Sequence, residues 1–194
     1  MRLNIYSALA ASVMIAGCVS VLPEPTTPDA LYRVETQTKL DGLSSDLVVR
    51  EPEAPRLIAG QGMVSEGADG GLRLIPGVEW SGNATRQIQL AMIDNFDVGK
   101  EHNAMLPEFG VSASFELATH LKTLHVQGDT ARCVMTVSLI NSRYRNLTRS
   151  KEVRSTHIAD SNSSRDRALA LQAAASDCAA QAAAFSIEAL TRDD

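Results

Sequence analysis

The clearest pattern of apolar and polar positions in this chain lies between residues 130 and 141, where every second side chain is apolar. A period of two predicts a strand with one buried face. A longer alternating run at 111–127 precedes it, and Gly128-Asp129 between the two is a turn signal. A more polar run at 147–159 follows. We therefore predict three consecutive long strands that form an antiparallel meander. The apolar positions of the middle strand are Ala131, Cys133, Met135, Val137 and Leu139.

Two other segments carry apolar side chains at helical spacing, which predicts two long helices. Ser81 is the expected N-cap of the first, which ends near residue 96. Ser163 and Asp166 form a candidate capping box for the second. This second helix is rich in alanine, so it can approach a sheet closely, and we expect both helices to cover one side of the sheet. The expected buried stripes are Ala84, Ile88, Ala91, Met92 and Phe96, and Leu171, Ala174, Ala175, Cys178, Ala182 and Phe185.

Shorter apolar runs in the first half of the chain predict further strands at 31–38 and 47–50. Two more, at 56–64 and 72–80, flank the glycine-rich segment 66–71 and read as a hairpin, because glycines supply the positive φ angles of a reversal. The predicted fold class is therefore α+β, with an antiparallel or mixed sheet and two long helices packed on one face.

The N-terminal segment has the features of a bacterial lipoprotein signal peptide. Arg2 precedes an apolar stretch at 3–15, which ends in the lipobox Ile15-Ala16-Gly17-Cys18. We expect cleavage after residue 17 and modification of Cys18 by diacylglycerol and an acyl chain, with no other cofactor. An ordinary cleaved signal peptide with a chance cysteine is the alternative.

The residues after Cys18 predict where the protein is anchored. Lipoproteins retained in the inner membrane tend to have Asp after the lipidated cysteine, whereas this chain has Val19. We therefore expect the periplasmic leaflet of the outer membrane. Three prolines within 23–28 favour an extended spacer. The chain then divides into a signal peptide at 1–17, a lipidated cysteine and tether at 18–30, and one folded domain at 31–194.

The net charge of the chain excludes nucleic acid as a partner, and one segment carries a cluster of basic residues. The whole chain has a formal net charge of −5, and removal of 1–17 with Arg2 leaves −6, so nucleic-acid binding is not expected. One segment around Glu152 is basic nonetheless. It could dock onto an acidic periplasmic partner or lipid headgroups, or its charges could protect an edge strand from aggregation. Its basic residues are Arg143, Arg145, Arg149, Lys151 and Arg154.

Three other residues, Trp80, Cys133 and Cys178, are candidates for a functional role. Trp80 either packs the first long helix onto the sheet or lies at a partner surface. Cys133 and Cys178 both fall on predicted inward faces, and the periplasm is oxidising. A disulfide closing their 45-residue loop would contribute about 4 kcal/mol in the chain-entropy model. The alternative is two buried thiols that do not meet.

Sequence patterns for catalysis or metal binding are missing. The four histidines are scattered, with no metal-type pair on a helix and no Cys-His cluster. The chain has no G-x-S-x-G nucleophile motif and no phosphate-binding loop. We therefore expect a protein that is not an enzyme and holds no metal.

Four short stretches, in a fixed order after the lipobox and before the long strands, resemble those of a known family. They are Leu31-Tyr32-Arg33-Val34, Leu47-Val48-Val49, Ala54-Pro55-Arg56-Leu57-Ile58 and Val78-Glu79-Trp80-Ser81. With the alanine-rich last helix, they make nearly the whole mature chain resemble the ABC-type transport auxiliary lipoproteins, which include the PqiC-like proteins.

This resemblance implies a non-enzymatic outer-membrane lipoprotein. Its partner would be a periplasmic Mce-domain (mammalian cell entry) protein with an ABC permease and ATPase, a system that carries lipids between the two membranes. The resemblance also allows a homo-oligomer. Two alternatives stay open: a periplasmic lipoprotein that carries lipid in its own cavity, and a structural or assembly lipoprotein of the cell envelope.

Overall fold

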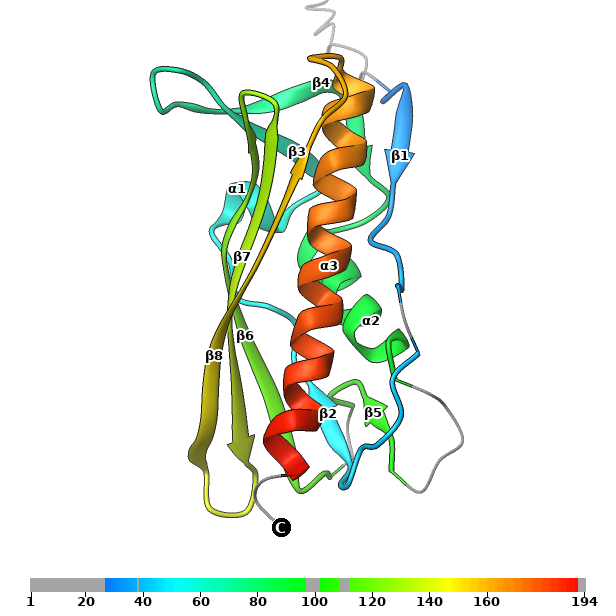
Figure 1. The fold of residues 1–194 in the computed structure, drawn as a ribbon, viewed down its shortest axis with the longest axis vertical. Helices are drawn as coiled ribbons and strands as arrows, with labels where there is room; N and C mark the ends of the chain where they lie inside the picture. Colours follow the sequence, from blue (N-terminus) through cyan, green and yellow to red (C-terminus); the bar gives the residue numbers. More distant parts are fainter. Residues whose placement is uncertain (1–26, 38, 97–101, 109–111, 192–194) are drawn as a thin grey trace, which may run out of the picture.

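A mixed sheet and two long helices form the protein in the computed structural model, which describes residues 27–37, 39–96, 102–108 and 112–191 (Figure 1). The expected signal peptide at 1–17, Cys18 and most of the tether lie outside the described residues. The predicted meander is confirmed: each of three long strands pairs antiparallel with the next. These strands are β6 (Phe115–Gln127), β7 (Thr130–Asn141) and β8 (Asn146–Ile158).

Strand β6 is the centre of the sheet, because its second edge receives two further groups of strands. A parallel strand pairs with its beginning and another with its end, and Glu53 bridges His120 between them. The sheet therefore forks along β6 into two branches, β2-β5 and β3-β4-β1. These shorter strands are β1 (Ala30–Tyr32), β2 (Leu47–Val49), β3 (Gly62–Glu66), β4 (Leu72–Trp80) and β5 (Ala104–Met105).

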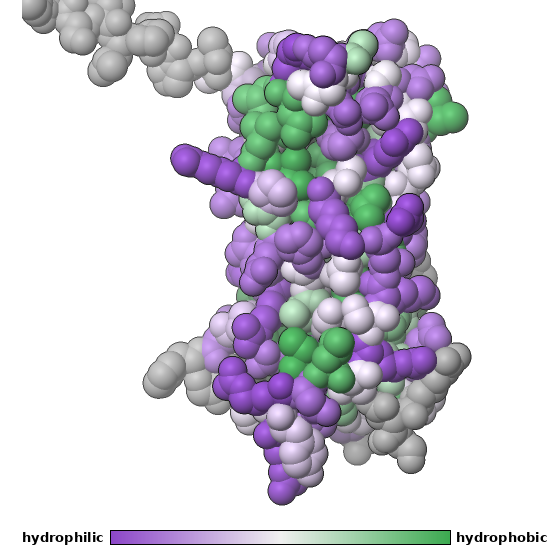
Figure 2. All heavy atoms as spheres, turned by 90° about the vertical axis from the view of Figure 1, so that its left-hand side faces the viewer, coloured by the Kyte–Doolittle hydropathy of each residue, from purple (hydrophilic) through white to green (hydrophobic). Residues whose placement is uncertain are grey.

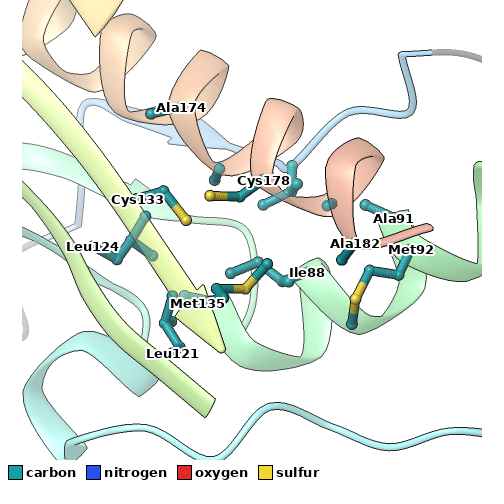
Figure 3. Packing of buried hydrophobic residues seen from close by; sticks show 14 of the residues in the cluster. Ile88, Ala91, Met92, Leu121, Leu124, Cys133, Met135, Ala174, Cys178 and Ala182 are labelled. Atoms are coloured by element: carbon teal, nitrogen blue, oxygen red, sulfur yellow. The ribbon is translucent and has the colours of Figure 1, made fainter. Parts of the chain in front are cut away.

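Helices α2 (Ala84–Asp94) and α3 (Ser164–Thr191) pack on the sheet and on each other. Figure 3 shows Ile88 and Met92 of α2 and Cys178 of α3 pointing into one cluster with Cys133 and Met135 of β7. All the inward-facing positions predicted for β7 are fully buried, as are most of the alanines on the sheet side of α3. The predicted fold class, α+β with both helices on the sheet, is confirmed.

The first half of the chain departs from the predicted strands at two places. Residues 56–59 of the strand expected at 56–64 form a short helix, α1 (Arg56–Ala59), and the strand that pairs with β4 covers 62–66. Pro55 explains the change, since its fixed φ of −54° suits the residue before a helix and it has no N–H to give to a strand. The strand expected at 31–38 is limited to β1, and Thr38 lies outside the described residues.

A β-bulge changes the buried face of β6. Leu121 pairs with Met135, but Thr123 pairs with Val134, so Lys122 is an extra residue. Before the bulge the odd positions Leu117 and Leu121 are buried, as predicted; after it the buried positions are even, at 124 and 126. The apolar positions of the sequence change from odd to even at the same point, and the prediction of one regular alternation over 111–127 overlooked this.

The caps of the two long helices differ in how well the sequence predicted them. Helix α2 begins after Asn83, not Ser81, and has no side-chain cap. At α3 the Ser163 hydroxyl accepts the N–H of Asp166 at 3.1 Å, as expected of an N-cap. The second bond of a capping box is replaced, because the N–H of Ser163 bonds the Ser161 hydroxyl, which itself donates to Asp166. These hydroxyls, Ser161 first, lower the pKa of Asp166.

Replacing Ser163 by alanine is expected to lower the free energy of unfolding by about 1 kcal/mol, because the N–H of Asp166 loses its acceptor. Urea denaturation followed by circular dichroism measures this difference. Ser81→Ala is the matched control, and it should change stability little, since α2 begins at Ala84 after the N-cap Asn83. Equal losses in the two variants would contradict the assignment of Ser163 as the cap.

Candidate partner-docking site

The basic residues of 143–154 do not form one surface, because successive side chains of a strand point to opposite faces. Lys151 points toward α3, where its ammonium lies 6.0 Å from the ring centre of Phe185 and 3.9 Å from the Glu188 carboxylate. Arg154 points to the other face and pairs with Glu152, which also binds Lys122 at 2.7 Å. These two pairings lower the pKa of Glu152. The alternation therefore divides the predicted basic cluster.

Arg149 and the two arginines of the loop lie at the lower end of the β7–β8 hairpin. Arg149 pairs in register with Leu139, and its Nη1 is buried with no hydrogen-bond partner among the described residues. Arg143 and Arg145 are exposed, and within the described part of the chain neither takes part in an ion pair. The unpaired positive charge of the segment is thus concentrated at this end of the molecule.

The hairpin loop is ordered by Asn141, the last residue of β7. Its side-chain oxygen accepts the N–H groups of Arg143 and Tyr144, each at 3.1 Å, and its carbonyl accepts the N–H of Arg145 at 2.8 Å. Asparagine is suited to this position because its short side chain bonds the backbone two residues on. Arg145 has φ 53°, which makes it the one described non-glycine residue in the left-handed region. The loop therefore presents its arginines in a fixed geometry.

Two apolar side chains accompany the arginines at this hairpin tip, which we define as Arg143, Tyr144, Arg145 and Leu147. Tyr144 is 69% exposed and Leu147 59%, and the guanidinium of Arg143 lies 5.5 Å from the centre of the Tyr144 ring. Arginine and tyrosine are enriched at protein interfaces and at their energetic centres. Tyr144 and Leu147 were not among the predicted site residues, although an aromatic residue between two arginines in a polar loop was a usable signal.

The tip lies at the opposite end of the molecule from the point where the tether joins the domain (Figure 1). That junction is fixed by the N–H of Asp29, which bonds the carbonyl of Gly77 at 2.8 Å. Strand β8 runs from Leu147, near the tip, to Ile158, near the other end, which is about 36 Å at the usual rise of a strand. The sheet therefore holds the tip well away from the tether.

Trp80 does not belong to a docking surface, because only 1% of it is exposed. It ends β4, and its N–H bonds the carbonyl of Gln61. Its side chain is part of the core cluster that also contains Ala84 and Ile88 of α2. Of the two interpretations of Trp80, packing of the helix onto the sheet is the one that its burial fits.

Cys133 of β7 and Cys178 of α3 meet in the core. Both are fully buried, and Figure 3 shows their sulfur atoms turned toward each other across the interface between strand and helix. No bond joins the two sulfurs in this structure. Burial, together with the neighbouring Cys178, raises the pKa of Cys133 well above its ordinary value. The two predicted inward orientations are confirmed, and the bond between the sulfurs stays a prediction.

The cluster of Ser155, His157 and Asp177 does not have the geometry of a nucleophilic triad. Asp177 of α3 accepts hydrogen bonds from Ser155 at 3.2 Å and pairs with Nε2 of His157 at 2.7 Å. In a nucleophilic triad the serine would bond the histidine, whereas both residues here contact the carboxylate. The cluster ties β8 to α3. The described ranges hold no group of three or more His, Cys, Asp or Glu placed to bind a metal.

Comparison with known proteins identifies the family of this chain. A model of the family described as the ABC-type transport auxiliary lipoprotein component matches residues 27–183. This chain belongs to that family. The family predicted from the sequence is thereby confirmed. As an ABC transport auxiliary lipoprotein, the chain is a component of an ABC-type transport system and is anchored to a membrane. None of the described helices is both long and apolar enough to cross a bilayer.

Solved structures agree with this ABC transport auxiliary lipoprotein in fold. Protein XCC0632 from Xanthomonas campestris, of the family DUF330, is 16% identical, with a TM-score of 0.75 over 84% of this chain and 98% of its own. A second, uncharacterized protein is 12% identical, with a TM-score of 0.61 over 83% of this chain and 98% of its own. At these identities the likeness supports the fold alone. No curated protein matches the sequence significantly.

Proposed function

We propose that this lipoprotein is a non-enzymatic auxiliary component of a Mce-type ABC system that moves lipids between the inner and outer membranes. Acyl chains on Cys18 would hold it in the periplasmic leaflet of the outer membrane, and the hairpin tip would bind the Mce-domain protein. The observation that carries this proposal is the separation of the tether junction from the exposed tip along the length of β8.

A protein that bridges a membrane and a partner needs an anchor and a contact surface at different ends. Two or three acyl chains provide a practically permanent anchor, because each buried methylene adds about 0.8 kcal/mol of membrane affinity. The β6–β7–β8 meander provides the spacer, since paired strands with one face buried under α3 form a stiff plate. A partner bound at the tip would thus be held at a set distance from the outer membrane.

The backbone of Arg145 supports a docking role for the tip. A left-handed conformation costs a non-glycine residue of the order of 1 kcal/mol, and glycine or asparagine usually occupies such a position. Strain of this kind at an exposed loop is a reason to look for a function of the side chain. The unpaired guanidinium of Arg145 would be attracted to an acidic surface on the partner, which raises the association rate and favours one orientation.

Crosslinking from position 144 in intact cells tests the proposal. A photo-crosslinking phenylalanine analogue in place of Tyr144 is expected to capture a Mce-domain protein, identified by mass spectrometry together with its permease. The same analogue in place of Leu169, an exposed residue of α3, is the matched control and should not capture it. Recovery of envelope-assembly or peptidoglycan proteins alone would favour the structural alternative, and co-purified lipid in the soluble domain would favour the carrier.

Replacing Arg145 by glycine should separate docking from folding. Glycine adopts φ 53° without strain, so the free energy of unfolding should stay within about 1 kcal/mol of the wild-type value. Loss of one interface arginine should weaken co-purification of the Mce-domain protein about tenfold. Arg154→Ala, which removes a guanidinium already paired with Glu152, serves as the control and should leave binding unchanged. Equal effects of the two variants would argue against the tip.

A further inference from the structure

Strands β4 and β1 carry three leucines that the fold leaves exposed. Leu72 and Leu74 of β4 are 46% and 55% exposed, and Leu31 of β1 is 60% exposed. Figure 2 shows hydrophobic side chains gathered in the upper part of the molecule, apart from a smaller group near its lower end. Exposed apolar side chains that gather on one face of a protein mark a surface for contact with another protein or a membrane.

The three leucines share one side of the sheet. Strand β4 buries Ile75, Val78 and Trp80 on the side of the core, so Leu72 and Leu74 face away from it. Leu31 pairs in register with Glu79, the half-buried residue between Val78 and Trp80, and so faces outward as well. We call these outward-facing residues, Leu31, Leu72 and Leu74, the leucine face.

The tether joins the domain beside the leucine face. Asp29 bonds the carbonyl of Gly77, and Ala30 pairs with Val78. Gly77 follows Leu74 by three residues, which is about 10 Å along a strand. Eleven residue steps separate Cys18 from Asp29, and at the rise of a proline-rich segment they reach at most about 34 Å. An acyl anchor on Cys18 therefore keeps the leucine face within reach of the bilayer, at a distance limited by the length of the tether.

Charges near the leucine face decide what kind of surface it suits. Arg73 lies between the two β4 leucines, but it is neutralised by Asp69 in an exposed ion pair that raises the pKa of Arg73 and lowers that of Asp69. Asp29 and Glu79 carry negative charge at this end of β4 and β1, whereas Glu66 pairs with His125 at 2.9 Å and lines the same pocket as Arg167. The contact that the three leucines themselves offer is apolar.

We infer that the leucine face rests on the phospholipid bilayer in which the chain is anchored, with its leucines at the boundary between headgroups and acyl chains. This inference builds on the proposed lipid anchor at Cys18. A weak apolar contact suffices, because the tether makes binding intramolecular and so raises the effective concentration of the bilayer. The contact would also orient the domain, with the hairpin tip pointing away from the membrane.

Quenching of tryptophan by brominated lipid tests this orientation. The lipidated full-length mature protein is reconstituted into phosphatidylcholine vesicles with brominated acyl chains, as wild type, Leu74→Trp and Leu147→Trp. Wild-type protein gives the baseline, because its single tryptophan, Trp80, is buried. Leu147 is a matched control, since it is a strand leucine of similar exposure at the opposite end. We expect quenching of Leu74→Trp to exceed that of Leu147→Trp about threefold.

Flotation of the same vesicles distinguishes failure of the proposed membrane contact from failure of the proposed lipid anchor. Protein that floats with the vesicles but shows equal quenching at both positions would overturn the membrane contact and leave the anchor standing. Protein that does not float would overturn the anchor and the contact together. Leu72→Trp is a second reporter on the same face, and quenching there as strong as at position 74 is expected. If Leu74→Trp fails to fold, Leu72→Trp alone decides the comparison with Leu147→Trp.

Discussion

Cys18→Ala is expected to move the protein from the membrane fraction to the soluble periplasmic fraction and to abolish its support of transport. The physical reason is that all the proposed acyl chains are attached through this one sulfur and the new amino group beside it. Without them, the leucine face is the remaining proposed membrane contact, and three partly exposed leucines bind a bilayer far more weakly than two or three acyl chains. Cell fractionation followed by immunoblotting measures the change.

Cys133→Ala is the control for the loss of a cysteine as such. It leaves Cys18 and the proposed anchor intact, so the protein should stay in the membrane fraction. A Cys18→Ala protein that fractionates with the membrane and supports transport like the wild type would exclude the lipoprotein anchor. Soluble Cys18→Ala protein that still binds the Mce-domain protein would show that anchoring and docking are separate properties, as the two-ended arrangement requires.

Reduction of the purified wild-type protein is expected to lower its free energy of unfolding by about 4 kcal/mol, the value for a cross-link that closes 45 residues. The reason is that a Cys133–Cys178 bond would restrict the unfolded chain. The two sulfurs already face each other across the β7–α3 interface, so the bond requires little movement of strand or helix. Urea denaturation with and without dithiothreitol measures the difference.

The Cys178→Ala variant supplies the control, because its stability should not depend on the reductant. Alkylation adds a second measurement. Free buried thiols resist iodoacetamide in the folded protein and react once it unfolds, whereas a disulfide leaves both cysteines unmodified in urea. Two results together would contradict the disulfide and show two buried thiols. The stability of the wild-type protein would be the same with and without dithiothreitol, and Cys133 and Cys178 would both be alkylated on unfolding.

The sequence predicted those elements whose local pattern agrees with their final environment. Strand β7 was predicted to the residue, because the meander exposes it evenly to one buried and one open face along its whole length. The turn at Gly128, the Ser163 cap and the inward orientations of Cys133 and Cys178 are local properties of the same kind. The predictions were wrong where a local feature interrupts a regular period. These features are the proline before 56–59, the uncapped start of the helix predicted from Ser81, and the bulge in β6.

For the candidate site, the sequence showed the basic residues but not how they are grouped. Counting charges along 143–154 cannot separate Lys151, which packs on Phe185, from Arg154, which pairs with Glu152 on the other face. The left-handed Arg145 and the exposure of Tyr144 depend on the loop that Asn141 closes. Burial of Trp80 likewise depends on α2 and the sheet meeting over it.

Sequence alone determined the family, the α+β class, the expected lipid anchor and the three strands of the meander, since each rests on residue types at a fixed local spacing. Only the tertiary structure decided which ends of those strands meet the tether and which lie opposite it. The distance between Asp29 and Tyr144 is set by how β1, β4, β6, β7 and β8 are placed side by side. Strand register and helix packing, which join residues far apart in the chain, therefore put the anchor and the docking tip at opposite ends.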